Sequence, residues 1–180
     1  KIVHLLASPF IWLKIHPNTI SLLALISVCF VFITVKQEMY VLTSLLILMN
    51  GLFDLIDGEV ARSLGKSSRF GKFLDRTIDK ISDAIILAAF VVYGLVEIKL
   101  GIYTMAAMFI ATNISANIEG VLHFKISDAV SLRFVRLTIL ILCVLLKQFW
   151  IMFVLLAVLS TYAVLYRFGA ACYYYFNRKK

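Results

Sequence analysis

Six long apolar stretches constrain the fold of this 180-residue chain more than any other feature. Hydrophobic residues make up 62% of the sequence and charged residues 16%, whereas soluble domains contain about 45–50% and roughly 25%. A helix that crosses a bilayer needs about 20 mostly apolar residues, and the stretches lack the alternation of membrane strands. We therefore predict an all-α integral membrane protein. The six predicted transmembrane helices are Pro17–Val35, Met39–Asp57, Phe73–Val96, Leu100–Glu119, Ser131–Leu146 and Phe149–Phe176.

The segment before the first span, KIVHLLASPFIWLK, is too short to cross a bilayer and mixes apolar with basic residues. We predict an N-terminal helix within residues 1–15 that lies in the membrane interface, with Trp12 as an aromatic anchor. Because no internal repeat divides the chain, residues 1–180 are expected to form a single transmembrane domain. The chain begins with Lys1 and not with methionine, so this expectation leaves room for a preceding N-terminal domain.

Basic residues are distributed unequally between the two ends of the predicted spans. One side carries 15 of the 18 Lys and Arg residues, and the other carries only Lys36, Lys99 and Lys147. Because positively charged loops stay in the cytoplasm, both termini and the segment 58–80 are expected to face the cytoplasm, in the plasma membrane of a prokaryote. This face would attract lipid head groups or phosphorylated substrates, and nothing in the sequence indicates nucleic acid.

A cluster of carboxylates separates the second and third apolar stretches. Asp54 and Asp57 are three residues apart, and Asp75 and Asp79 are four apart, so each pair lies on one face of its helix. Since the connecting loop is short, the two pairs are expected to meet. Ionised Asp inside a membrane needs compensation, and Mg²⁺, Mn²⁺ and Ca²⁺ prefer oxygen ligands. The alternative is a solvated surface with ion pairs within each helix, such as Asp75 with Lys72.

Small and basic residues lie among these carboxylates. A residue without a large side chain lets a bulky ligand approach the backbone closely, although each would also suit tight helix packing. The small residues are Gly58, Ala61, Gly65 and Gly71. Arg62 follows Asp54 by eight residues, on roughly the same helix face, where it can reach a phosphate.

These residues form one long pattern. Its eight positions are Asp54-x-x-Asp57-Gly58-x-x-Ala61-Arg62, then eight residues, then Gly71-x-x-x-Asp75-x-x-x-Asp79. The pattern resembles the complete signature of the CDP-alcohol phosphatidyltransferase family, and a match of this length is far more specific than a short motif. The resemblance covers most of the chain and implies six spans, an N-terminal interfacial helix and a site that faces the cytoplasm.

The family resemblance implies a metal-dependent transfer reaction. Asp54, Asp57 and Asp75 would hold divalent metal, Mg²⁺ or Mn²⁺ with Ca²⁺ also able to occupy the site, and Asp79 would complete the site and act as the general base. An acceptor hydroxyl would attack the β-phosphorus of a CDP-linked lipid and release CMP in phospholipid biosynthesis. The metal would neutralise charge on the leaving group while a carboxylate accepts the proton of the nucleophile.

The same resemblance assigns residues to the nucleotide. The residues expected to cradle the CDP part of the donor are Gly58, Ala61, Arg62 and Gly71. At the start of the first span, Pro17-Asn18-x-x-Ser21 resembles the Pro-Asn-x-x-Thr element of the family, with Ser in place of Thr. Asn18 and Ser21 are therefore further candidates for the nucleotide site.

Arginines in the last two spans suggest which alcohol accepts the lipid group. Arg133, Arg136 and Arg167 would form an anion pocket suited to bidentate capture of a phosphate, with Lys125 as an additional cation; each could instead anchor the chain at the membrane interface. The pattern resembles the inositol-phosphate synthase branch, although the segment SANIEG departs from the Arg-rich element of that branch and retains only Glu119. Glycerol phosphate or serine as acceptor, and CDP-inositol as donor, stay open.

Assembly and two other functional classes complete the sequence-based hypotheses. The family tends to form homodimers through its third and fourth spans, where this chain has small residues that favour helix contact. These are Ala84, Ala88, Ala89, Ala106 and Ala107. An intramembrane prenyltransferase also uses Asp-rich metal sites but usually has more spans, and a cation transporter commonly has paired repeats with broken helices. Neither additional spans nor paired repeats with broken helices are evident in this sequence.

Overall fold

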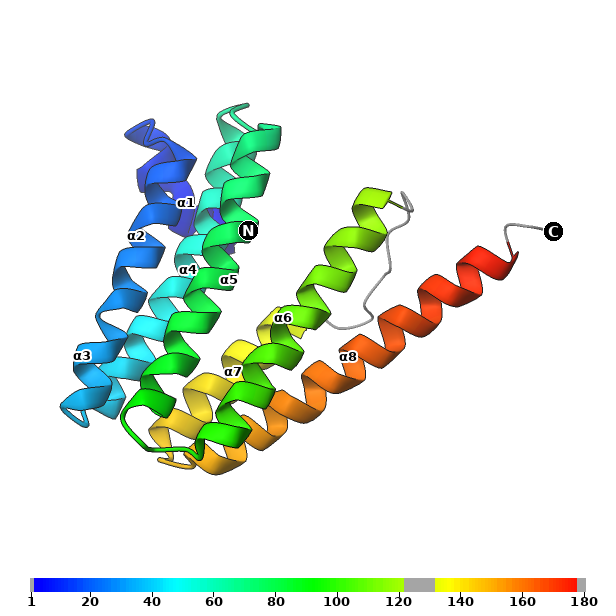
Figure 1. Ribbon diagram of the computed structural model, residues 1–180. Coiled ribbons are helices and arrows are strands. Elements are labelled where there is room, and N and C mark those ends of the chain that lie inside the picture. The colour runs from blue at the N-terminus through cyan, green and yellow to red at the C-terminus, as the bar shows by residue number, and fades with distance from the viewer. Residues whose placement is uncertain (1, 122–131, 178–180) are drawn as a thin grey trace. The chain divides into compact units, whose positions relative to one another are not determined.

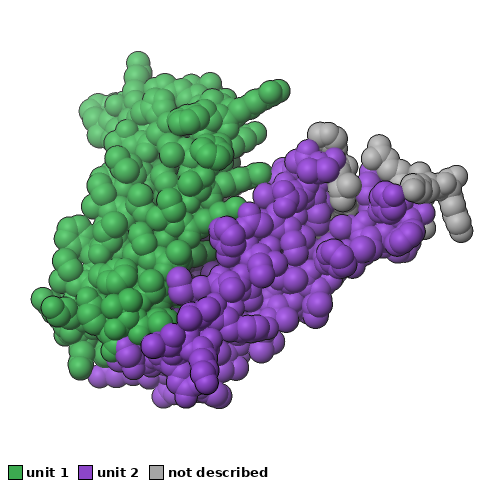
Figure 2. All heavy atoms as spheres, in the orientation of Figure 1, with its two compact units in different colours: residues 1–93 green, residues 94–180 purple. Residues whose placement is uncertain are grey.

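The computed structural model describes residues 2–121 and 132–177, and within these ranges all regular secondary structure is α-helical (Figure 1). The chain divides into two compact units, residues 1–93 and 94–180 (Figure 2). The first unit contains α1 (Ile2–Trp12), α2 (Pro17–Cys29), α3 (Val31–Lys36), α4 (Tyr40–Ser63) and α5 (Arg69–Val92). The second unit contains α6 (Ile98–Val121), α7 (Leu132–Leu145) and α8 (Phe149–Asn177).

Four helical segments in the described part of the chain are long and apolar enough to cross a membrane. They are Pro17–Lys36, Tyr40–Ser63, Ile98–Val121 and Phe149–Phe176, which correspond to the first, second, fourth and sixth predicted spans. The third predicted span, α5, is a helix of 24 residues whose first half is rich in charge, and the fifth, α7, has 14 residues. The all-helical class is confirmed, whereas the count of six spans stays a prediction.

In the first unit, α2 packs against both α4 and α5. Asn50 on α4 joins all three helices, because its Nδ2 atom donates to the Ala24 carbonyl oxygen at 3.2 Å and to Ser82 Oγ at 3.3 Å. A buried amide in an apolar bundle must find such partners. These two hydrogen bonds therefore fix the register of α2, α4 and α5, of which α4 and α5 carry the carboxylates.

The first helix, α1, has one face in the protein and one face exposed. Ala7 is fully buried in a cluster of apolar residues contributed by α2 and α4, while Leu5 and Trp12 are exposed. Pro9 lies inside α1 and lacks an N–H group; Ser8 Oγ donates to the carbonyl oxygen of Leu5 at 2.8 Å and satisfies the acceptor that Pro9 leaves. The predicted N-terminal helix is therefore present, and its location in the membrane interface stays a prediction.

A tight turn brings α5 back beside α4. The N–H of Lys66 donates to the Ala61 carbonyl oxygen at 2.9 Å and the N–H of Gly65 donates to that of Arg62 at 3.2 Å, which is the Schellman pattern of helix ends. Gly65 has φ +63°, a conformation that glycine adopts without steric cost. Ser68 then caps α5, because its Oγ accepts the N–H of Gly71 at 2.9 Å.

In the second unit, α8 packs against both α6 and α7. Thr104 Oγ1 on α6 donates to the Phe153 carbonyl oxygen at 3.4 Å, and the hydroxyl oxygens of Tyr103 and Thr161 lie 2.8 Å apart. Side-chain hydrogen bonds of this kind hold helices together where apolar burial gives little preference for one neighbour over lipid.

Candidate active site

Three carboxylates from two helices converge at the end of α4. Asp54 and Asp57 of α4 and Asp75 of α5 each offer an oxygen, and these oxygens lie within 4.8 Å of one another. Asp57 is 5% exposed and accepts a hydrogen bond from Ser21 Oγ of α2. Three like charges at this separation repel one another strongly in a partly buried site. The set therefore has the charge and the oxygen donors to hold a divalent cation.

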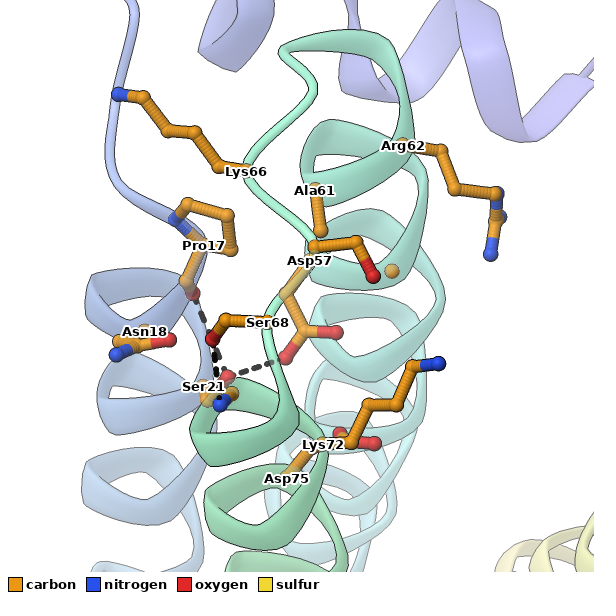
Figure 3. A pocket seen from close by; sticks show the side chains of 13 residues that line it. Pro17, Asn18, Ser21, Asp57, Ala61, Arg62, Lys66, Ser68, Lys72 and Asp75 are labelled. Carbon is orange, nitrogen blue, oxygen red and sulfur yellow. Dashed lines mark hydrogen bonds between the residues drawn. The ribbon is translucent and has the colours of Figure 1, made fainter.

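A pocket of about 340 Å³ lies beside this carboxylate set (Figure 3). Its lining comes from α2, α4, α5 and the turn between α4 and α5. The lining residues are Pro17, Asn18, Ser21, Asp57, Gly58, Ala61, Arg62, Lys66, Ser67, Ser68, Gly71, Lys72 and Asp75. All six residues that the sequence assigned to the nucleotide are in this set, so the structure brings them together in one place. These six residues come from three helices, α2, α4 and α5.

The two glycines in the pocket wall differ in the space around them. A Cβ atom on Gly71 would lie 3.1 Å from Ser68 Oγ and 3.7 Å from Asn18 Oδ1. A Cβ atom on Gly58 would lie 3.5 Å from Arg62 Nη1, which is ordinary van der Waals contact with a flexible group. A Cβ atom on Gly71 would therefore crowd the capping side chain of Ser68, whereas one on Gly58 fits beside Arg62.

Asp79 lies one helical turn beyond Asp75 on α5 and is not part of the three-carboxylate group. The structure thus unites three of the four predicted metal-site residues, and the role of Asp79 stays a prediction. Sequence reasoning did not assign Lys66, Ser67 or Ser68 to the site. The Gly65 turn and the capping position of Ser68 are the signals that could have placed this turn against the pocket.

The candidates for acceptor binding lie in the second unit. Arg133 and Arg136 on α7 are half-buried, and Arg167 on α8 is 8% exposed. Arg167 Nη1 donates to the carbonyl oxygen of Ala111 on α6 at 2.9 Å. The guanidinium of Arg167 is thus held inside the helix bundle and does not extend to the surface as an interface anchor would. Lys125 lies outside the described residues.

A sequence model for CDP-alcohol phosphatidyltransferases matches residues 14–162, a stretch that includes all the candidate residues of the first unit. The chain belongs to this family. The predicted resemblance is therefore confirmed.

Curated relatives of this chain are named as synthases or transferases. An archaetidylinositol phosphate synthase of Pyrococcus horikoshii is 30% identical over 100 residues, which cover 56% of this chain and 53% of the relative. A CDP-diacylglycerol–glycerol-3-phosphate 3-phosphatidyltransferase of Aquifex aeolicus is 40% identical over 65 residues, which cover 36% of each protein. The chain thus spans about half, or less, of the length of these curated relatives.

The fold is shared with a solved enzyme. The structure of the phosphatidylinositol phosphate synthase of Mycobacterium tuberculosis with CDP-DAG bound has a TM-score of 0.80 and 21% sequence identity, and the match covers 94% of this chain and 93% of the other. The same enzyme in complex with manganese and citrate gives a TM-score of 0.79. At this identity the likeness establishes a common fold.

Proposed function

We propose that this protein transfers a phosphatidyl-type group from a CDP-linked lipid to a phosphorylated polyol and releases CMP. The observation that carries this proposal is the position of the three-carboxylate set at a pocket lined by all six predicted nucleotide residues. Of the alternatives, neither a prenyltransferase nor a cation transporter accounts for the match of residues 14–162 to the CDP-alcohol phosphatidyltransferase family.

The carboxylate set suits Mg²⁺ or Mn²⁺. Its ligands are all hard oxygen donors, the type that these cations prefer, and the M. tuberculosis enzyme of the same fold was solved with manganese. A divalent cation held by Asp54, Asp57 and Asp75 would supply neutralisation of the diphosphate charge. Ser21 keeps the carboxylate of Asp57 in place through their hydrogen bond.

The basic residues of the pocket would bind the donor. Asp79, which is not among the pocket-lining residues, would accept the proton. Arg62, Lys66 and Lys72 bring three cations to the pocket wall, where they would pair with diphosphate oxygens. Asp79, one turn further along α5, would accept the proton of the acceptor hydroxyl as general base.

The test of the proposed reaction is CMP release by the purified protein in lipid. CDP-diacylglycerol and its ether-lipid analogue are supplied as donors, each with inositol phosphate, glycerol phosphate, free inositol or serine as acceptor. We expect CMP release that depends on a phosphorylated polyol. Inositol phosphate is the proposed acceptor because relatives are named archaetidylinositol phosphate synthase and phosphatidylinositol phosphate synthase. Glycerol phosphate is the second candidate because the Aquifex relative is named as a glycerol-3-phosphate phosphatidyltransferase. CMP release with free inositol or serine would contradict the phosphate requirement.

Replacing Arg136 with alanine is expected to raise the acceptor KM by about tenfold and to leave donor affinity unchanged. A charge-assisted hydrogen bond contributes about 1.5–3 kcal/mol, and 1.4 kcal/mol is a factor of ten. Steady-state kinetics with each substrate varied in turn measures both effects. A lower yield with normal kinetics in the surviving protein would show that Arg136 only anchors the chain at the membrane interface.

Replacing Gly58 with alanine is expected to raise the donor KM several-fold without loss of stability. Alanine is favoured over glycine inside a helix by about 1 kcal/mol, and the nearest atom to the new Cβ is a flexible one at 3.5 Å. Gly71→Ala is the matched comparison and should lower the melting temperature, since its Cβ crowds Ser68 Oγ at 3.1 Å. Equal losses of stability in both variants would contradict this assignment.

We also propose six spans with both termini and the pocket on the cytoplasmic side. The distribution of basic residues supports this orientation, and α5 and α7 would supply the third and fifth spans. Labelling of single cysteines introduced at position 66 and at position 38 tests it. Labelling of position 66 only from outside intact cells would overturn the proposed orientation.

The proposed homodimer would use exposed small residues of α5 and α6. Ala84 and Ala106 are exposed and Ala88 is half-buried, whereas Ala89 and Ala107 are buried within the single chain and are not available to a partner. Small residues let two helices approach closely in a bilayer. Mass measurement in a mild lipid environment should give twice the chain mass, and a monomer would count against the proposal.

A further inference from the structure

A chain of three polar side chains links α1 to the wall of the active-site pocket. His4 Nδ1 donates to Glu59 Oε1 at 3.0 Å, and Arg62 Nη2 donates to Glu59 Oε2 at 2.9 Å. Glu59 thus has one partner on each carboxylate oxygen, and one of them comes from a residue 55 positions away in the sequence. We propose that His4 and Glu59 are positioning residues that orient Arg62 for the CDP-linked donor; this inference rests on the proposed function.

The packing of α1 places His4 opposite Glu59. Ala7 is fully buried against Ile56 and Val60 of α4, and residues three or four apart on a helix share a face. His4 precedes Ala7 by three residues, and Glu59 follows Ile56 by three. The apolar contact therefore brings the two polar side chains into hydrogen-bond distance on the same side of both helices.

The contact with Glu59 holds the Arg62 guanidinium beside Gly58 at the edge of the pocket. Nη2 is bound to Glu59, while Nη1 lies 3.5 Å from the position that a Cβ of Gly58 would take, on the pocket wall. The Arg62 side chain is 68% exposed, so without Glu59 it would sample many rotamers. Fixing it before the donor arrives removes part of the ordering cost of binding.

The positioning effect is expected to be modest and to appear in donor binding. Exposed ion pairs contribute up to about 1 kcal/mol, and the side chains of His4 and Arg62 are 63% and 68% exposed. His4→Ala and Glu59→Gln should therefore raise the donor KM by about three- to fivefold, with kcat unchanged. The acceptor KM should stay constant, because neither residue belongs to the carboxylate set.

The experiment measures donor KM, kcat, melting temperature and chemical modification of Arg62 in the full chain in lipid. His4→Asn should restore the donor KM, because its Nδ2 amide lies near the position of the His4 Nδ1 atom and can donate to Glu59. Ser8→Ala is the matched control: it removes a hydrogen bond within α1, from Ser8 Oγ to the Leu5 carbonyl oxygen, without touching Glu59. It should leave the donor KM unchanged even where it lowers the melting temperature.

Two further measurements decide whether His4 acts through Arg62. In an Arg62→Ala background, His4→Ala should raise the donor KM no further, since coupled residues are not additive. Modification of Arg62 by phenylglyoxal, quantified by mass spectrometry, should be faster in His4→Ala and Glu59→Gln than in the wild type. An unchanged modification rate in both variants, or a full additional loss in the double variant, overturns the proposal.

The modification rate also separates this inference from the proposed function. If the wild-type protein releases no CMP from any CDP-linked lipid, the proposed function fails. Faster modification of Arg62 in the two variants would then still support the positioning by His4 and Glu59, and an unchanged rate would reject it.

Discussion

Replacing Asp57 with asparagine is expected to lower turnover by about a thousandfold or more while the protein still folds and inserts. Loss of a metal ligand removes several kcal/mol of transition-state stabilisation, and each 1.36 kcal/mol is a factor of ten in rate. Asparagine has the same shape and its amide oxygen can still accept the hydrogen bond from Ser21. The fold should therefore survive, because the change removes charge and not volume.

The measurement combines CMP release with the affinity for Mn²⁺ in wild type and variant. Asp57→Asn should require far more metal or show no saturation, with a melting temperature in the absence of metal close to that of the wild type. Glu38→Gln is the control. It removes a carboxylate just before the start of α4, at the end of that helix far from the site, and turnover, metal affinity and melting temperature should all be normal. Full turnover of the wild type in excess chelator would defeat the metal hypothesis.

Asp79→Asn is expected to reduce kcat by about a hundred- to ten-thousandfold, the usual contribution of a positioned general base. Donor affinity should change little, because the base acts on the acceptor hydroxyl in the transition state. The structural reason is that Asp79 lies outside the three-carboxylate group, one turn further along α5. We therefore expect Asp79 to act in proton transfer and not as a primary ligand of the metal.

Asp75→Asn provides the comparison for this prediction. It removes a member of the carboxylate group and should raise the metal concentration needed for half-maximal rate much more than Asp79→Asn does. Single-turnover kinetics at saturating donor and metal isolates the chemical step. If Asp79→Asn showed normal single-turnover chemistry and weak donor binding, Asp79 would be a binding group and the base would have to be another residue.

The helical membrane class and most of the pocket beside the carboxylates could be predicted from the sequence. Apolar run length sets which segments become helices, since a backbone without water must satisfy its hydrogen bonds within the segment. The three- and four-residue spacings of the Asp pairs fix which side chains share a helix face. The pattern lies on two helices joined by one short turn, so the sequence predicted that the Asp pairs would meet, and the packing of α4 and α5 on α2 brings Asp54, Asp57 and Asp75 together.

The contacts between segments distant in sequence depend on the tertiary packing and could not be predicted from the sequence. The hydrogen bonds from Ser21 to Asp57 and from His4 to Glu59, and the burial of Ala89 and Ala107, depend on how helices pack. Such contacts depend on helix crossing, rotation and side-chain rotamers, for which sequence spacing carries no direct signal. The periodicity of a helix determines which residues share a face. The packing of the helices determines which residues that face contacts.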